Sequence, residues 1–434
     1  MTISRHIRKV LGVCVALIML AACGGAGAPS PTAAPAAEPT RTVLLLWHAW
    51  PAPADRALSA IVERYNRATP GVQVLLQSRP VVSIHSDLVG AVADGGGPHM
   101  AILPSHSLGA LVADGSILPV DGLLPEGDLA RLIPAAVGAA QVRTTDAATL
   151  YGVPLTFDTL ALYYNKANFT GDPPADTDEL LRVARGITDA SSDPPYWGLA
   201  YNLSLDRTLA YLYAFGGRIF DDTGEVVLGL DGRAGAEAWL AWLLELREDE
   251  RILASLDGVA VDNALTTQQA MMTIDWAHAL GTYSMIWQSN LGVAPLPRLA
   301  GADGAPRPYV QSDVLVLNAR LGASAEQAAA AAFARYLIGE AAQWELLRAG
   351  RQPVLLSLDL SADDVGLAPE LRDAAIAFRA QAESGLPMPN AVESAEVVWP
   401  LLTDMHSNAL RRLLTPAQAV ENADATLRAR LGRQ

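Results

Sequence analysis

The sequence predicts an α/β protein with two lobes, and three features indicate this fold class. A short apolar run over residues 43–46 is followed by a helical pattern over 55–68 and by a second apolar run over 72–76. A strand, a helix and a strand in this order make a βαβ unit, whose two strands are parallel. The alternation continues along the chain, which at 434 residues is long enough for two hydrophobic cores.

Four later segments are predicted to be helices. Thr177 caps the first of them, and residues 231–248 place apolar side chains along one face of the second. Ser324 begins a capping box that starts a long alanine-rich helix reaching Gly350. Thr415 begins a similar capping box, and we expect the last helix of the chain to start there.

The first residues form a different kind of segment. A basic start, an apolar run over residues 10–22 and small residues before Cys23 are typical of a secretory signal peptide. The run is too short to span a bilayer, which needs about 20 helical residues. Residues 20–24 (LAACG) resemble the bacterial lipobox, whose cysteine is lipidated and becomes the new first residue. We therefore expect a lipoprotein signal peptide at 1–22; an anchor helix and a plain signal peptide cut elsewhere are the alternatives.

A flexible tether is expected over residues 23–41. Between residues 24 and 40 the chain consists of Gly, Ala, Pro, Ser and Thr with the single acidic residue Glu38. Such a composition cannot bury a core. Together with lipidation of Cys23, it predicts an exported protein anchored to the outer face of the cell membrane, with its folded part held clear of the lipid.

Charge and cysteine content exclude several classes of function. The chain carries a net charge of −15, and loss of Arg5, Arg8 and Lys9 with the signal peptide lowers it to −18. Such a surface repels nucleic acid, so we expect no nucleic-acid partner. The two cysteines, Cys14 and Cys23, both lie in or at the end of the signal peptide, which leaves no thiol for a disulfide, a metal or catalysis.

Motifs of catalysis and of metal binding are not found in the sequence. The seven histidines lack the spacing of a metal site, and neither a Gly-x-Ser-x-Gly elbow nor a phosphate-binding loop is present. We expect no catalytic residue, no metal and no cofactor.

Tryptophans are the most informative side chains. Trp47 and Trp50, with His48 between them, follow the first predicted strand, and the carboxyl ends of strands face the ligand crevice in an open α/β sheet. Indoles stack on the C–H faces of sugars. Trp276 follows a similar apolar run over 270–275. The alternative is that Trp47 and Trp50 cover the sheet end and that Trp276 packs in the core.

The chain resembles the extracellular solute-binding proteins of ABC sugar importers, the family of the maltose-binding protein. Seven segments carry the resemblance over roughly residues 42–430, and their order is more specific than any one of them. They are 20–24; the first strand with 47–50 (WHAW); 97–102 (GPHMAI) with 111–120 (LVADGSILPV); 151–158 (YGVPLTFD) with 162–166 (LYYNK); 216–221 (GGRIFD); 270–276 (AMMTIDW); and 292–297 (GVAPLP). The family usually has Asp where His99 stands, so we expect altered geometry there within the same fold.

The resemblance implies two lobes, each a mostly parallel sheet flanked by helices, joined by hinge strands around a ligand cleft. Residues 42–156 with 312–356 would form the N-terminal lobe. Residues 157–311 with 357–434 would form the C-terminal lobe. Each lobe is then discontinuous in sequence.

The resemblance also implies which residues bind the ligand, position by position. They are Trp47, His48, Trp50, Ser105, His106, Asp158, Asn202, Asp206, Arg207, Gly216, Gly217, Trp276, Gln311, Ser312, Asp313 and Trp399. Arg207 is the single cation among them, which argues against phosphate, sulfate or dicarboxylate ligands.

These features predict a monomeric binding protein that captures a sugar or oligosaccharide by hinge closure and delivers it to an ABC permease. Three alternatives stay open. A secreted carbohydrate-active enzyme would need two carboxylates among Asp158, Asp206, Asp275 and Asp313 at a suitable separation. A binding protein could signal to a receptor. An iron-binding relative would need paired tyrosines, and adjacent tyrosines in a strand point to opposite faces.

Overall fold

The computed structural model describes residues 41–143, 148–168, 171–221, 225–302, 304–322, 324–361 and 366–432. The predicted signal peptide, Cys23 and the tether up to residue 40 lie outside these residues. None of the helices within the described ranges is long and apolar enough to cross a membrane.

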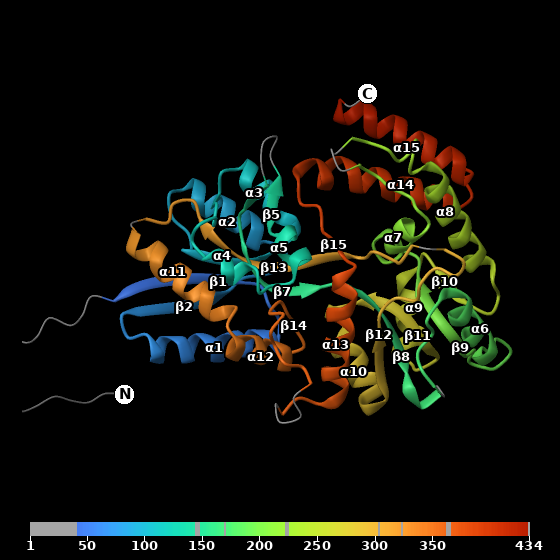
Figure 1. Cartoon of the computed structure of the whole chain (residues 1–434), viewed down its shortest axis with the longest axis horizontal. Coiled ribbons are helices and arrows are strands. Elements are labelled where there is room, and N and C mark those ends of the chain that lie inside the picture. Colours follow the sequence, from blue (N-terminus) through green and yellow to red (C-terminus); the bar gives the residue numbers. More distant parts are fainter. Residues whose placement is uncertain are drawn as a thin grey trace, which may run out of the picture. The chain divides into compact units, whose positions relative to one another are not determined.

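Two sheets with flanking helices organise the described chain, which confirms the α/β fold class (Figure 1). The first sheet has the order β14-β7-β13-β3-β1-β2, with β15 and β4 also paired to β13; the second has the order β10-β9-β11-β8-β12. The first sheet consists of β1 (Thr42–His48), β2 (Val72–Ser78), β3 (Met100–Pro104), β4 (Ile117–Leu118), β7 (Val153–Asp158), β13 (Tyr309–Asn318), β14 (Gln352–Pro353) and β15 (Leu386–Pro387). The second consists of β8 (Leu160–Asn165), β9 (Trp197–Asn202), β10 (Leu253–Ser255), β11 (Ala270–Trp276) and β12 (Leu291–Ala294), and β5 (Gln141–Arg143) pairs separately with β6 (Ala148–Leu150).

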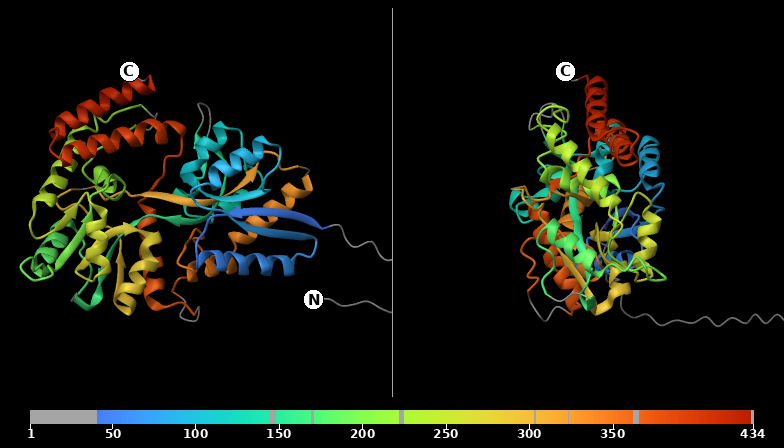
Figure 2. Two further views of the ribbon diagram at one scale, coloured as in Figure 1. Left: turned by 180° about the vertical axis from the view of Figure 1, so that it is seen from behind. Right: turned by 90° about the vertical axis from the view of Figure 1, so that its right-hand side faces the viewer.

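Helices cover both faces of the first sheet, with α1 and α12 on one side and α2 and α3 on the other (Figures 1 and 2). The helices associated with the first sheet are α1 (Ala54–Ala68), α2 (Ile84–Ala93), α3 (Leu108–Ala113), α4 (Glu126–Leu129), α5 (Pro134–Ala139), α11 (Ser324–Leu337) and α12 (Glu340–Arg348). The remaining helices are α6 (Thr177–Ile187), α7 (Leu205–Ala214), α8 (Arg233–Glu248), α9 (Gly258–Thr266), α10 (Leu280–Trp287), α13 (Pro369–Glu383), α14 (Trp399–Leu410) and α15 (Pro416–Leu431).

The first βαβ unit forms as predicted, with β1 parallel to both β2 and β3. The first strand, however, is longer than its apolar run. Trp47 and His48 are the last two residues of β1 and pair in register with Gln77 and Ser78, so they lie in the strand and not in a loop after it. His99 replaces the expected Asp just before β3, and its Nδ1 accepts a hydrogen bond from the Leu45 N–H at 2.9 Å.

Two predicted helix boundaries were wrong. The alanine-rich helix is interrupted: α11 ends at Leu337 and α12 begins at Glu340, because Gly339 takes an extended conformation and the Gln343 amide donates to the Leu337 carbonyl at 2.9 Å. The cap of α6 is Asp176, whose carboxylate accepts from the Glu179 N–H.

The capping box at the start of the last helix is confirmed. The Thr415 side chain accepts a hydrogen bond from the Gln418 N–H, and the Gln418 side chain accepts one from the Thr415 N–H. Two further predicted helices are present as α1 and α8.

The chain passes from the first sheet to the second at Thr159, between β7 and β8. The Thr159 hydroxyl donates to the carbonyl of Tyr309, the first residue of β13, which belongs to the first sheet. β8 runs antiparallel to β11 and β13 runs antiparallel to β3, so both sheets are mixed. The lobe limits given above stay a proposal.

Two hydrophobic cores lie against these sheets. The side chains of β8 alternate between them: Leu160, Leu162 and Tyr164 belong to one core, while Ala161 and Tyr163 belong to the other. The second core also holds His406 of α14, which lies 5.4 Å from the Trp239 ring and 3.2 Å from the Thr208 hydroxyl. Burial lowers the pKa of His406 to about 4.

Stability should therefore fall in mild acid, in part through His406. The neutral imidazole is retained in the folded state, whereas the unfolded chain binds a proton below about pH 6.5. The contribution is fully present above that pH and is lost as pH falls towards about 4, on the order of 3 kcal/mol in total. Urea unfolding at about pH 7 and about pH 5 should show a smaller difference for His406→Gln than for the wild type. Equal differences would contradict the assignment.

Candidate ligand-binding site

A cavity of about 640 Å³, here called the main cavity, is lined by residues that follow strands of both sheets. His106 follows β3 in the first sheet, Trp276 ends β11 in the second, and Gln311 lies on β13 near the crossing. The lining residues are His106, Ser204, Leu205, Asp206, Arg207, Trp276, His278, Tyr309, Gln311, Met388, Pro389, Ala395, Trp399 and Thr403. A volume of this size is typical of a small-molecule site.

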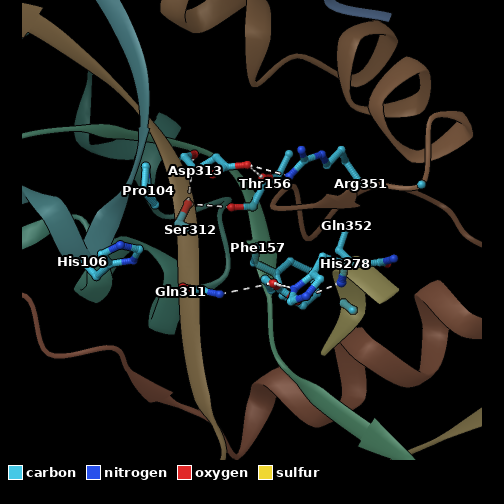
Figure 3. A pocket seen from close by; sticks show the side chains of 13 residues that line it. Pro104, His106, Thr156, Phe157, His278, Gln311, Ser312, Asp313, Arg351 and Gln352 are labelled. Carbon is cyan, nitrogen blue, oxygen red and sulfur yellow. Dashed lines mark hydrogen bonds and ion pairs between the residues drawn. The ribbon is translucent and has the colours of Figure 1, made fainter. Parts of the chain in front are cut away.

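A smaller cavity of about 150 Å³, here called the hinge cavity, adjoins the main cavity. The two share His106, His278 and Gln311, so these side chains stand at the junction. Figure 3 shows the hinge cavity between β7 and β13, with Asp313 and Arg351 facing one another at one end. Its other lining residues are Pro104, Thr156, Phe157, Asp158, Ala277, Ser312, Gly350 and Gln352.

Aromatic side chains form the walls of the main cavity. The Trp276 ring is fixed because its Nε1–H donates to the Asp206 carboxylate at 2.9 Å. Tyr309 meets Trp399 edge to face, with centroids 5.6 Å apart, and its hydroxyl lies 2.6 Å from that of Tyr213. These contacts present rigid ring surfaces to a ligand.

Arg207 is already paired with carboxylates. Its Nη2 lies 2.8 Å from Asp275 and its Nη1 lies 3.3 Å from Asp206. Asp275 is buried and also accepts from the Tyr283 hydroxyl and the Trp276 N–H. Burial alone would lower the pKa of Arg207, but the two carboxylates outweigh it and raise that pKa. The guanidinium is therefore occupied, and it offers little to an anionic ligand.

Asp158 organises the junction of the two cavities. Its carboxylate accepts from the backbone N–H of His278, lies 2.7 Å from the His278 Nδ1, and accepts from the Gln311 amide at 3.2 Å. The hydrogen bond to Asp158 raises the pKa of His278. Burial lowers the pKa of His106, which favours a neutral ring that can both donate and accept at neutral pH.

Asp313 is held in the wall of the hinge cavity. It accepts from the Trp50 Nε1–H and from Arg351 Nη1, both at 2.8 Å, and the Arg351 guanidinium lies 5.0 Å from the Trp50 ring centroid. The second arginine at the cavities is thus also neutralised by a carboxylate. Within the described residues no group of three or more His, Cys, Asp or Glu side chains is placed to hold a metal ion.

The structure brings nine of the predicted site residues to the two cavities. His106, Asp206, Arg207, Trp276, Gln311 and Trp399 line the main cavity. Asp158, Ser312 and Asp313 line the hinge cavity, together with His106 and Gln311. Trp47, His48, Trp50, Ser105, Asn202, Gly216 and Gly217 line neither.

The residues at the end of β1 are occupied by packing. The Trp47 indole donates to Gln77 at 2.8 Å and lies under the Arg79 guanidinium. His48 is buried, which lowers its pKa. Trp50 supports Asp313, as described above. Trp47 and Trp50 therefore pack at the end of the sheet, as the alternative interpretation had it, and they do not lie exposed in a ligand-binding loop.

Ser105, Asn202 and the two glycines also serve the fold. The Ser105 hydroxyl accepts from the Ser312 N–H, and the Asn202 amide accepts from the Ser204 N–H just before α7. Gly216 has φ +80°, and a Cβ on Gly217 would come within 3.0 Å of the Ala236 nitrogen. The close backbone approach at Gly217 is therefore to helix α8, and Gly216 is required for its left-handed conformation.

Sequence reasoning did not select the other residues that line these cavities. Those with a polar, aromatic or sulfur-containing side chain or a place near a predicted residue include Ser204, His278, Tyr309, Arg351, Met388, Pro389 and Thr403. His278 follows Trp276 by two residues, and Met388 and Pro389 lie in a string noted for its resemblance to the family, so position alone could have suggested these three. Arg351 reaches the site through its ion pair with Asp313, and no sequence pattern indicates that these two residues meet.

Removal of Asp275 should strongly destabilise the fold. Asp275→Ala leaves the largely buried Arg207 without its closest carboxylate, and we expect a loss of roughly 3 kcal/mol in the free energy of unfolding. Glu345→Gln is the matched control, because Glu345 pairs with Arg64 nearer the surface and should cost less than about 1 kcal/mol. Urea unfolding measures both, and an equal cost for the two variants would contradict this account.

Comparison with known proteins agrees with this geometry. The sequence profile of the bacterial extracellular solute-binding protein family matches residues 60–371. A maltose/maltodextrin-binding domain from Bdellovibrio bacteriovorus, bound to maltotriose, is similar in structure, with a TM-score of 0.70 and 24% identity over 90% of this chain and 100% of that one. The maltotriose-binding protein of Thermus thermophilus, bound with maltotriose, is similar with a TM-score of 0.69 and 24% identity, over 90% of this chain and 100% of that one.

A cyclo/maltodextrin-binding protein complexed with maltotetraose gives a TM-score of 0.76 with 21% identity, over 92% of this chain and 100% of that one. These similarities confirm the two-lobed fold. A search among curated protein sequences returns no match. Because the family profile spans most of the chain, the protein belongs to the bacterial extracellular solute-binding proteins and is an exported protein that binds a solute.

Proposed function

We propose that the protein captures a neutral carbohydrate in the main cavity and delivers it to the permease of an ABC transporter. The observation that carries this proposal is the lining of that cavity: Trp276, Tyr309 and Trp399 supply ring surfaces, while His106 and Gln311 supply hydrogen bonds. Sugars offer both an apolar C–H face and hydroxyl groups, and this combination of side chains suits both.

The charges around the cavities favour a neutral ligand over an anionic one. Arg207 is paired with two carboxylates, and Arg351 is paired with Asp313. Recognition of a phosphate or a carboxylate needs donors that are free to form bidentate bonds. The structures similar to this chain include three with bound maltotriose or maltotetraose, which supports a malto-oligosaccharide as the first ligand to test.

Capture would follow from the two lobes. His106 comes from the first sheet and Trp276 from the second, so a ligand in contact with both favours the conformation in which they are close. Residues 42–156 with 312–356 and 157–311 with 357–434 would be the two moving bodies. We propose that the protein acts as a monomer.

The paired carboxylates support binding without turnover. Asp158, Asp206, Asp275 and Asp313 each accept hydrogen bonds or ion pairs from neighbouring side chains. A glycosidase needs one carboxyl group that protonates the leaving group and a second that acts as nucleophile or base. All four carboxylates are taken up by these structural contacts, and we propose no catalytic activity.

Trp276→Ala should weaken binding of a neutral oligosaccharide by roughly 1–3 kcal/mol, because truncation removes a fixed aromatic surface. Calorimetric titration with maltotriose measures the effect. Trp344→Ala is the control, since Trp344 is buried on α12 and lines neither cavity. We expect a lower melting temperature and unchanged affinity for the control. Unchanged affinity in Trp276→Ala would assign that ring to the core.

We further propose that a lipid on Cys23 anchors the protein to the outer face of the cell membrane. Cys23→Ala should then release the protein from the membrane fraction into the medium or the periplasm. Fractionation followed by immunodetection measures this. Retention of the variant in the membrane would instead indicate an uncleaved anchor helix.

A further inference from the structure

A third cavity, of about 400 Å³, lies next to the main cavity, and the proposed function does not assign it a role. Residues of the β5–β6 hairpin lie on one side of it, and residues of the C-terminal helices lie on the other. In Figure 1 this is the region where β5 faces the start of α14. Its lining residues are Gly138, Gln141, Arg143, Ala148, Phe220, Pro387, Met388, Pro389, Asn390, Ala391, Glu393, Ser394, Val398 and Leu431.

The third cavity adjoins the main cavity. Met388 and Pro389 line both, so a ligand long enough to reach past these two residues would have both cavities within its span. The hinge cavity, by contrast, shares none of its lining residues with the third cavity. The three therefore form a series, with the main cavity in the middle.

The segment between the two larger cavities is held in place. The Asn390 amide donates to the carbonyls of Ala139 and Gln141, both at 2.8 Å. The Asn390 carbonyl also lies so close to Gly109 that a Cβ there would meet it at 2.0 Å. Because Asn390 is held at both its side chain and its backbone, the boundary that Met388 and Pro389 form between the two cavities is a fixed part of the fold.

The lining suits a neutral polyhydroxylated chain. Phe220, Val398 and Leu431 supply apolar surface, and Phe220 is half-buried with an aromatic ring. Arg143 and Glu393 carry opposite charges and are exposed at the rim. Ring surface bordered by hydrogen-bonding groups is the same combination that lines the main cavity.

We propose that the third cavity is a remote subsite for the far end of an oligosaccharide whose other end occupies the main cavity. This inference rests on the proposed function and adds to it that the ligand is a linear chain longer than the main cavity holds. The units in the third cavity add affinity because they are tethered to units already bound.

The test is a calorimetric titration with maltose, maltotriose, maltotetraose and maltohexaose. In the wild type, affinity should rise by about tenfold between maltotriose and maltohexaose. Ala148→Trp places a bulky side chain at an exposed position of the cavity wall, and Phe220→Ala removes its ring. Both variants should lose most of the gain with length while binding maltose as the wild type does. Trp276→Ala, as comparison, should weaken every length alike.

The outcomes separate the remote subsite from the proposed function. Wild-type affinity that does not change beyond maltotriose overturns the subsite and leaves sugar binding intact. A gain with length that survives in both variants also overturns it. Binding of no member of the series by the wild type contradicts the subsite and the malto-oligosaccharide ligand together. Melting temperatures check that both variants fold, and one folded variant is sufficient for the decision.

Discussion

The ion pair between Arg207 and Asp275 is the interaction on which the binding site depends. It joins the start of α7 to the end of β11. Arg207 also contacts Asp206, which accepts from the Trp276 indole, and Asp275 accepts from the Trp276 backbone N–H. Taking these charges out of water is costly. The pair is stable because Asp275 accepts hydrogen bonds from the Tyr283 hydroxyl, the Trp276 backbone N–H and the Arg207 guanidinium. The same network holds the Trp276 ring in the wall of the main cavity and pairs the Arg207 guanidinium with carboxylates.

A similar arrangement recurs in the hinge cavity. Asp313 is satisfied by the Trp50 indole and by Arg351, so that β13, the residues after β1 and the segment before β14 are tied together. Asp206 and Asp313 each accept a hydrogen bond from an indole N–H and pair with an arginine. The charges stabilise the positions of the rings, and recognition is left to ring surfaces and to neutral donors and acceptors such as His106 and Gln311. Such a site discriminates by shape and by hydrogen bonding.

The sequence allowed the fold class, the first βαβ unit and the last capping box to be predicted, because each depends on local patterns of apolar residues and caps. The break after Leu337 could not be predicted from pattern alone, since it depends on the Gln343 side chain reaching back to a carbonyl. Trp47 was expected in a loop because apolar periodicity does not show where a strand ends. Its pairing with Gln77 extends β1 by two residues.

The candidate site was predictable where a residue lies at the carboxyl end of a strand. Trp276 ends β11 and His106 comes shortly after β3, and the structure places both at the main cavity. Arg351 and Tyr309 were missed because they reach the cavities through tertiary contacts with Asp313 and Trp399. The assignment of Gly216 and Gly217 rested on family position, while the structure requires Gly216 for its positive φ and Gly217 for its close packing against Leu212 and α8.

A crystal structure of the protein grown with maltotriose tests the central claim most directly. The account predicts sugar density in the main cavity, stacked on Trp276 or Trp399 and in contact with His106 from the other sheet. Density confined to the surface of one lobe, or a main cavity without sugar at a concentration where binding is measured in solution, would contradict it.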